Sequence, residues 1–166
     1  MRQRIWPLLL ALAASGASAA GFLVSGGSMA SSVFCRAYGC TVAGSGGGLK
    51  AYRLKQNPAV GVVSQVKGGR VSAMQFVLQN PGKVTDRQLL QALTSALPDF
   101  QVASLGARHP FKVSVACLKS PTPPKTIRLG GRPFTFSCTY GPQAKLASLY
   151  KLAPKTPLIV LTYTRK

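Results

Sequence analysis

Carboxylates, which carry general acid–base chemistry in many enzymes, are almost missing from this chain of 166 residues. Asp86 and Asp99 are the only two acidic residues. If they stand at the two ends of one helix, a rise of 1.5 Å per residue places them roughly 20 Å apart. The paired carboxylates of glycosidases lie within about 5–9.5 Å of each other. The sequence therefore argues against a glycosidase.

A nucleophilic active site would depend on His109, the only histidine of the chain. This residue precedes Pro110 in an expected turn, and no serine stands in the glycine-flanked turn that presents a nucleophile in many hydrolases. A single histidine in such a turn is usually exposed and plays no part in catalysis. We therefore expect no catalytic residue and interpret the protein as non-enzymatic.

The cysteines do not have the spacing of a metal site. Cys35 and Cys40 are separated by four residues, and Cys117 and Cys138 stand far apart, whereas zinc sites use closely spaced pairs. Two carboxylates are too few to build a site for a hard cation. The glycine run over 44–48 also lacks the Lys-Ser/Thr pair of a phosphate-binding loop. We expect neither a metal nor a cofactor.

Positive charge is the chemical feature that this sequence does offer. The chain has 21 Lys and Arg, and its formal net charge is +19. Bases flank the turns at Gly68-Gly69 and Gly130-Gly131, and another base stands in the turn before residue 111. Backbone N–H groups and paired bases can together hold an anion. The candidate anion-binding residues are Lys67, Arg70, Arg108, Arg128 and Arg132. The alternative is that these bases only keep exposed turns soluble, but an ordinary soluble surface mixes both signs of charge.

The partner predicted by this charge is an envelope polymer, a lipid head group or a nucleic acid. Binding to nucleic acid would be non-specific and dominated by phosphate contacts, because Phe111, Phe134 and Phe136 fit core positions rather than exposed stacking positions. The functional hypothesis is an exported protein of the envelope or the extracellular space that binds an anionic partner. The alternative is a structural subunit or adaptor of an envelope assembly, with the protein contacts made by an apolar hairpin and the N-terminal arm.

The N-terminus predicts export. Arg2 and Arg4 precede an apolar run over residues 8–14, and small residues over 17–20 suit a signal peptidase. We expect residues 1–20 to be removed as a signal peptide, which would leave no stable transmembrane segment. A retained anchor is the alternative. The expected location is secreted or periplasmic, where cysteines form disulfides.

Four cysteines allow three disulfide connectivities. Cys35 and Cys40 enclose a short loop, whereas Cys117 and Cys138 each fall on the apolar face of an alternating segment. Neighbouring strands could bring the second pair together. This pattern favours Cys35–Cys40 and Cys117–Cys138.

The elements that would position these residues form one α+β domain over 49–166, preceded by a flexible Gly/Ser/Ala-rich arm over 21–48. Apolar runs on both sides of each Gly-Gly turn predict two hairpins. In the first, Lys67 should face Arg70 and Val63 should face Met74. The alternating segment 111–119, a short segment over 100–103, and the segment 158–164, which is β-branched and apolar on both sides, add further strands. Together they predict a mostly antiparallel sheet of about six to seven strands.

Two amphipathic helices are expected to pack on this sheet. Thr85 and Gln88 form a capping box, in which each side chain bonds the backbone N–H of the other residue. Apolar residues then recur at helical spacing, and Pro98 is expected to end the helix. The second helix is expected to begin near Pro142 and to end before Pro154.

Overall fold

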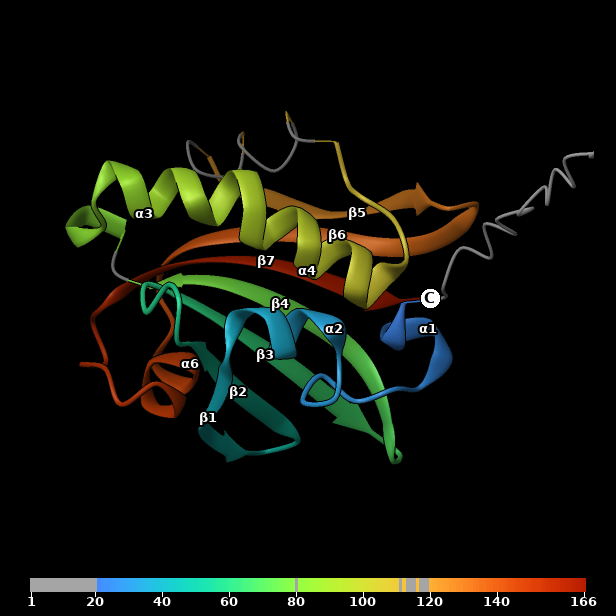
Figure 1. Cartoon of the computed structure of the whole chain (residues 1–166), viewed down its shortest axis with the longest axis horizontal. Helices are drawn as coiled ribbons and strands as arrows, with labels where there is room; N and C mark the ends of the chain where they lie inside the picture. Colours follow the sequence, from blue (N-terminus) through green and yellow to red (C-terminus); the bar gives the residue numbers. More distant parts are fainter. Residues whose placement is uncertain (1–20, 80, 111, 113–115, 117–119) are drawn as a thin grey trace, which may run out of the picture.

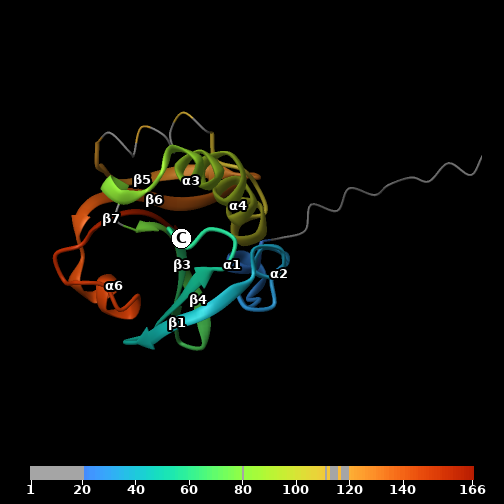
Figure 2. The same ribbon diagram turned by 60° about the vertical axis from the view of Figure 1, so that its left-hand side comes forward.

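The computed structural model describes residues 21–79, 81–110, 112, 116 and 120–166 (Figure 1). Within these residues, seven antiparallel strands form one sheet in the order β1-β2-β3-β4-β7-β6-β5. The strands are β1 (Cys40–Gly46), β2 (Leu49–Leu54), β3 (Val60–Lys67), β4 (Arg70–Gln79), β5 (Thr122–Leu129), β6 (Arg132–Pro142) and β7 (Pro157–Arg165). Figure 2 shows that this sheet is strongly curved. The predicted α+β class with an antiparallel sheet is confirmed, whereas the predicted signal peptide lies outside the described residues.

The turn between β3 and β4 is made by Gly68 and Gly69, whose φ angles are +58° and +74°. Both values are in the left-handed region, which glycine adopts without the steric cost that a Cβ would bring. Lys67 pairs with Arg70 across this turn. Beyond it a β-bulge at Ser72 shifts the register, so that Val63 faces Gln75 and not Met74 as expected. One extra residue on β4 is enough to move every later pair by one position.

A long helical segment lies across one face of the sheet (Figure 1). It consists of α3 (Asp86–Gln91), a π-helical stretch over Ala92–Ala96, and α4 (Leu97–Leu105). The predicted capping box is present: Gln88 N donates to Thr85 Oγ1 at 3.3 Å, and Thr85 N donates to Gln88 Oε1 at 3.1 Å. The helix begins where the sequence predicts.

Pro98 does not end this helix, which corrects the prediction from sequence. A proline inside an α-helix lacks an N–H to donate, and its ring collides with the carbonyl four residues earlier. Here the wider π turn precedes Pro98, which then occupies the first turn of α4. The helix continues through 100–103, where a strand was expected, and ends at Gly106 with a φ of +78°.

The segment 21–48 differs most from its prediction as a flexible arm. It forms α1 (Phe22–Ser25), α2 (Val33–Tyr38) and the edge strand β1. Its large side chains enter the main core beside α4: Phe22, Leu23, Met29, Phe34 and Tyr38 are buried there. Glycines and serines connect these buried residues within a compact segment. Because Gly and Ser dominate the composition of 21–48, the sequence suggested a flexible arm.

The opposite face of the sheet is covered only in part, by α6 (Ala144–Leu149) (Figure 2). Tyr150 follows this helix and is fully buried against Val63, Val77 and Val160. Both faces of the β3–β4 hairpin are therefore covered by the chain's own helices. The structure has the two additional helices α1 and α2, which the sequence did not predict.

The strand expected over 111–119 lies largely outside the described residues, and the two residues described within it, Lys112 and Ala116, are helical. None of the helices in the described part of the chain has both the length and the apolar character needed to cross a membrane.

Candidate anion-binding site

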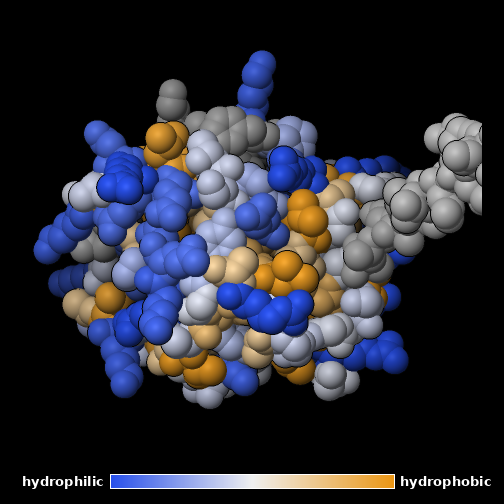
Figure 3. All heavy atoms as spheres, viewed as in Figure 1, coloured by the Kyte–Doolittle hydropathy of each residue, from blue (hydrophilic) through white to orange (hydrophobic). Residues whose placement is uncertain are grey.

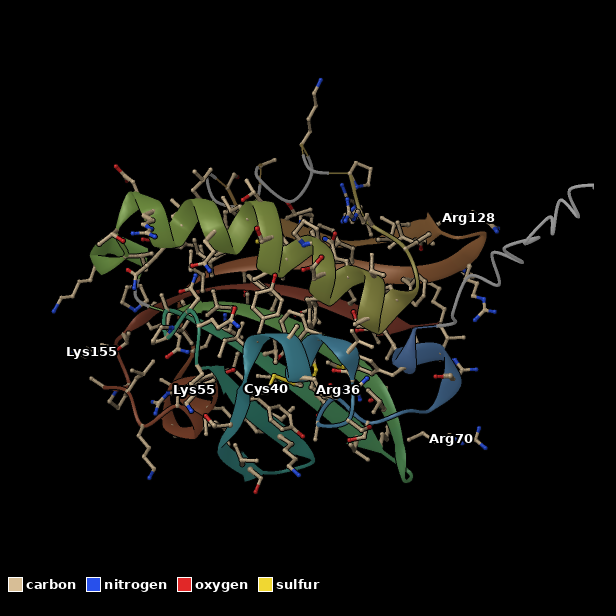
Figure 4. The ribbon with its side chains drawn as sticks, viewed as in Figure 1. Arg36, Cys40, Lys55, Arg70, Arg128 and Lys155 are labelled. Atoms are coloured by element: carbon tan, nitrogen blue, oxygen red, sulfur yellow. A yellow bond between two sulfur atoms is a disulfide. The ribbon has the colours of Figure 1, made fainter. Side chains whose placement is uncertain are left out.

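Strand register places both basic hairpin turns at one end of the sheet. β7 lies between the two hairpins: Ala73 of β4 pairs with Thr164, and Phe134 of β6 pairs with Arg165. The turns of β3–β4 and β5–β6 both lie beyond these pairs, on the side where β7 ends. Figure 4 shows Arg70 and Arg128 at this same end of the molecule. We call the six exposed bases gathered here the basic rim: Lys67, Arg70, Arg128, Arg132, Arg165 and Lys166.

Four of the five predicted residues thus share one end of the sheet, but they do not close on a single pocket. Strands of one sheet are about 4.8 Å apart, so β4 and β6 are separated by roughly 10 Å where both pair with β7, and the two turns extend beyond these pairs. Arg70 and Arg128 extend from separate turns (Figure 4). The rim is a row of cations suited to an extended anion with several charges, not a cradle for one small ion.

Arg165 and Lys166 belong to the rim although the sequence analysis did not select them. Lys166 Nζ donates to Thr126 Oγ1 at 2.7 Å, which fixes the C-terminus against β5. Their position follows from the order of the strands and not from the local sequence. β7 lies between the two hairpins and runs antiparallel to β4 and β6, so its last residues lie beside the turns that precede these two strands.

Neither of the two acidic side chains of the chain lies at the rim. Asp86 is in the first turn of α3, and Asp99 lies in α4, where its Oδ2 accepts a hydrogen bond from Tyr38 Oη at 2.8 Å. Burial and this bond to Asp99 raise the pKa of Tyr38, so the phenol remains protonated. The positive charge of the rim is therefore not neutralised by an acidic side chain.

Arg108, the fifth predicted residue, lies in the loop that follows α4. A Cβ placed on Gly130 would be 3.8 Å from the Cβ of Ala107, so this loop touches the turn of the β5–β6 hairpin. Arg108 is exposed and stands beside the rim. It also borders a groove on the helical face.

That groove, of about 770 Å³, runs between α1, α2 and α4. Figure 3 shows hydrophobic side chains over α2 and α4, with hydrophilic side chains on both sides of them. Arg36 and Arg108 line it together with Val33, Val102 and Asp99. This groove could not be predicted from a sequence in which 21–48 is expected to be a flexible arm. The carboxylate of Asp99 makes the groove less suited to an anion than the rim.

His109 is not the exposed turn residue that the sequence predicts. Its side chain is 6% exposed, and its ring lies edge-on to Phe136 with the centroids 4.6 Å apart. Its Nδ1 is 3.3 Å from Tyr163 Oη, and its backbone N–H donates to Gln101 Oε1 at 3.1 Å. Burial, and next the charge of Lys125, lower the pKa of His109. The histidine joins α4 to the sheet as a neutral core residue.

The predicted disulfide Cys35–Cys40 is confirmed, and it links α2 to the start of β1. Cys138 is also held in a disulfide, while its predicted partner, Cys117, lies outside the described residues. Among the residues that the structure describes, no three His, Cys, Asp or Glu side chains come together as a metal site would require.

Comparison of the chain with protein-family models, curated proteins and solved structures gave no match.

Proposed function

We propose that the protein is an exported, strongly basic, non-enzymatic protein that binds an anionic polymer or surface through its basic rim. The observation that supports this proposal is the register of β4, β7 and β6. It brings two Gly-Gly turns and the C-terminus to one end of the sheet, with six exposed bases. A row of unneutralised cations binds a polyanion by releasing its counterions, which is a favourable, salt-dependent process. The Cys35–Cys40 disulfide supports an oxidising compartment.

The test compares charge reversal at the two ends of the sheet. The rim variant is Lys67→Glu/Arg70→Glu/Arg128→Glu/Arg132→Glu. The matched control carries the same change in charge where β2 and β4 end and β7 begins: Lys55→Glu/Lys83→Glu/Arg87→Glu/Lys155→Glu. Figure 4 shows Lys55 and Lys155 far from Arg70 and Arg128. All eight residues are exposed, so the substitutions should leave the core intact.

The measurement is the salt concentration at which each protein elutes from immobilised heparin. We expect the rim variant to elute at a much lower salt concentration than the control. When the logarithm of its heparin affinity is plotted against the logarithm of salt concentration, we also expect a shallower slope for the rim variant. The reason is that this variant neutralises fewer charges of heparin on binding. Equal losses in the two variants would show that only the total charge matters, and would refute a site at the rim.

The two surfaces that suggested an adaptor, the apolar hairpin and the N-terminal segment, are largely covered within the chain itself. The β3–β4 hairpin was a candidate contact surface because it is apolar on both faces, but the chain's own helices cover both of them. Most of the large apolar residues of 21–48 are likewise buried in the main core, although Val33 and Val42 stay exposed. We therefore give preference to the polyanion hypothesis.

A further inference from the structure

The sheet face that carries α6 is polar where that helix does not cover it. Alternation along the strands turns Thr135 and Ser137 of β6 to this face, together with Thr162 and Thr164 of β7. Thr135 pairs with Thr164, and Ser137 pairs with Thr162, so the four hydroxyl groups form two adjacent cross-strand rows. The rows extend to Thr126 of β5 on one side and to Gln75 of β4 on the other. We call these six residues the hydroxyl face.

The side chains of the hydroxyl face are exposed or half-buried, although the Oε1 atom of Gln75 is buried. Thr126 is exposed, and the other five are half-buried, as expected for residues in the middle of a sheet. Thr126 accepts a bond from Lys166, and Gln75 Nε2 donates to Thr162 Oγ1 at 3.4 Å. Within the described residues, the side chains of Thr135, Ser137 and Thr164 have no hydrogen-bond partner in the protein. These hydroxyl groups are free to donate to a ligand and to accept from it.

The hydroxyl face is continuous with the basic rim. Arg128 follows Thr126 by two residues on β5, so its side chain lies on the same face of the strand. Lys166 lies on this face as well, because it bonds Thr126. Both acidic side chains of the chain belong to α3 and α4, which cover the other face of the sheet. A ligand on this surface therefore meets hydroxyl groups beside positive charge.

The hydroxyl face indicates which of the anionic partners that could bind the rim, a lipid surface, a nucleic acid or an acidic polysaccharide, fits the whole surface best. Within the described residues, the large exposed hydrophobic side chains stand on helices, on β1, at the β3 turn, or, as Tyr140, on the other face of β6. The hydroxyl face thus has no apolar residue to enter a lipid layer. It also has no aromatic ring on which a nucleobase could stack. A chain of sugars with acidic groups matches both parts of the surface, because sugar hydroxyls pair with Thr and Ser while acidic groups pair with Arg and Lys.

We propose that the anionic partner is an acidic polysaccharide, which lies along the hydroxyl face with its charged groups against the basic rim. This inference depends on the proposed function, which it makes more specific. The rows of hydroxyls cross neighbouring strands and extend beyond a single sugar ring, so the surface suits a polymer. Each hydrogen bond contributes only about 0.5–1.5 kcal/mol net. Specificity then comes from several such bonds acting together, and affinity comes mainly from the rim.

The test removes hydroxyl groups without changing charge. Thr135→Val/Thr164→Val deletes one cross-strand pair and keeps β-branched side chains that suit a strand. The matched control, Thr41→Val/Ser45→Ala, deletes two exposed hydroxyls from the distant edge strand β1. Thr135→Ser/Thr164→Ser restores the hydroxyls and serves as the rescue variant. Affinities are measured at one salt concentration for heparin, an acidic polysaccharide, and for linear polyphosphate, which has no sugar hydroxyls.

We expect Thr135→Val/Thr164→Val to weaken heparin binding about tenfold, as the loss of two hydrogen bonds implies, and to leave polyphosphate binding unchanged. The control and rescue variants should bind both polymers like the unaltered protein. Unchanged heparin binding, or an equal loss for both polymers, overturns this inference. The rim hypothesis stands in that case if the rim variant loses both polymers. If the unaltered protein binds neither polymer, the proposed function itself is wrong.

Discussion

The phenol of Tyr150 lies directly over Gly61 of β3. Its hydroxyl donates to the carbonyl oxygen of Val62 at 3.2 Å, and a Cβ built on Gly61 would collide with the phenol oxygen. No side chain fits at this position while Tyr150 remains in place. Because burial raises the pKa of Tyr150, its hydroxyl stays protonated and remains a donor.

Gly61→Ala should therefore destabilise the protein. The added methyl group must displace a fully buried ring, and such overpacking costs about 1–3 kcal/mol. Chemical denaturation would measure this loss as a lower free energy of unfolding. Gly46→Ala is the matched control, because Gly46 is also a strand glycine but has open space where the Cβ would lie. Equal stability of the two variants would show that Tyr150 does not occupy the observed position.

Stability should fall as the solution becomes mildly acidic. Burial lowers the pKa of His109 below its ordinary value of 6.5, so just below pH 6.5 the unfolded chain binds a proton that the folded protein does not. The free energy of unfolding is then highest above this pH and decreases below it, by at most about 1.4 kcal/mol per pH unit. Thermal unfolding from pH 5 to pH 8 would show the effect.

His109 is the chain's only histidine, which makes the assignment simple. In His109→Gln, the melting temperature should change little between pH 5 and pH 8, since glutamine does not titrate. Persistence of the full pH dependence in this variant would mean that another group causes it.

The capping box allows a smaller and more local prediction. Thr85→Ala removes the oxygen that accepts from Gln88 N, and the helix loses about 1 kcal/mol of stability. Thr85→Ser keeps the hydroxyl and should remain close to the unaltered protein. Denaturant titration followed by circular dichroism would distinguish the two variants. A loss of the same size in both would assign the effect to the methyl group of Thr85 instead of the cap.

The parts of the fold that could be predicted are those specified by short-range chemistry. Thr85 and Gln88 predict the helix start because a capping box involves only four residues. Gly68 and Gly69 predict a turn for the same reason. The bulge at Ser72 could not be predicted, because nothing in a Val-Ser-Ala sequence distinguishes a bulged residue from a paired one. Pro98 led to a wrong prediction of the helix end. A π-helical turn relieves the clash of the proline ring with the preceding carbonyl, and such a turn leaves no signature in the sequence.

The candidate site was predictable in composition but not in arrangement. The bases beside Gly68-Gly69 and Gly130-Gly131 are visible in the sequence, whereas their common position depends on β7 lying between the two hairpins. That order is set by long-range pairing. The hydroxyl face has the same origin: Thr135 and Thr164 become neighbours only when β6 pairs with β7.

The disulfides give the last prediction. Cys35–Cys40 closes a very short loop, so the chain-entropy model assigns it only about 2 kcal/mol. Cys35→Ala/Cys40→Ala should lower the free energy of unfolding by about this amount and loosen the contact between α2 and β1. Non-reducing peptide mapping should recover Cys35 linked to Cys40 and Cys117 linked to Cys138. Free thiols at Cys117 and Cys138 in protein isolated from its natural compartment would contradict both the second pairing and the proposal of export, because an oxidising compartment would have joined them.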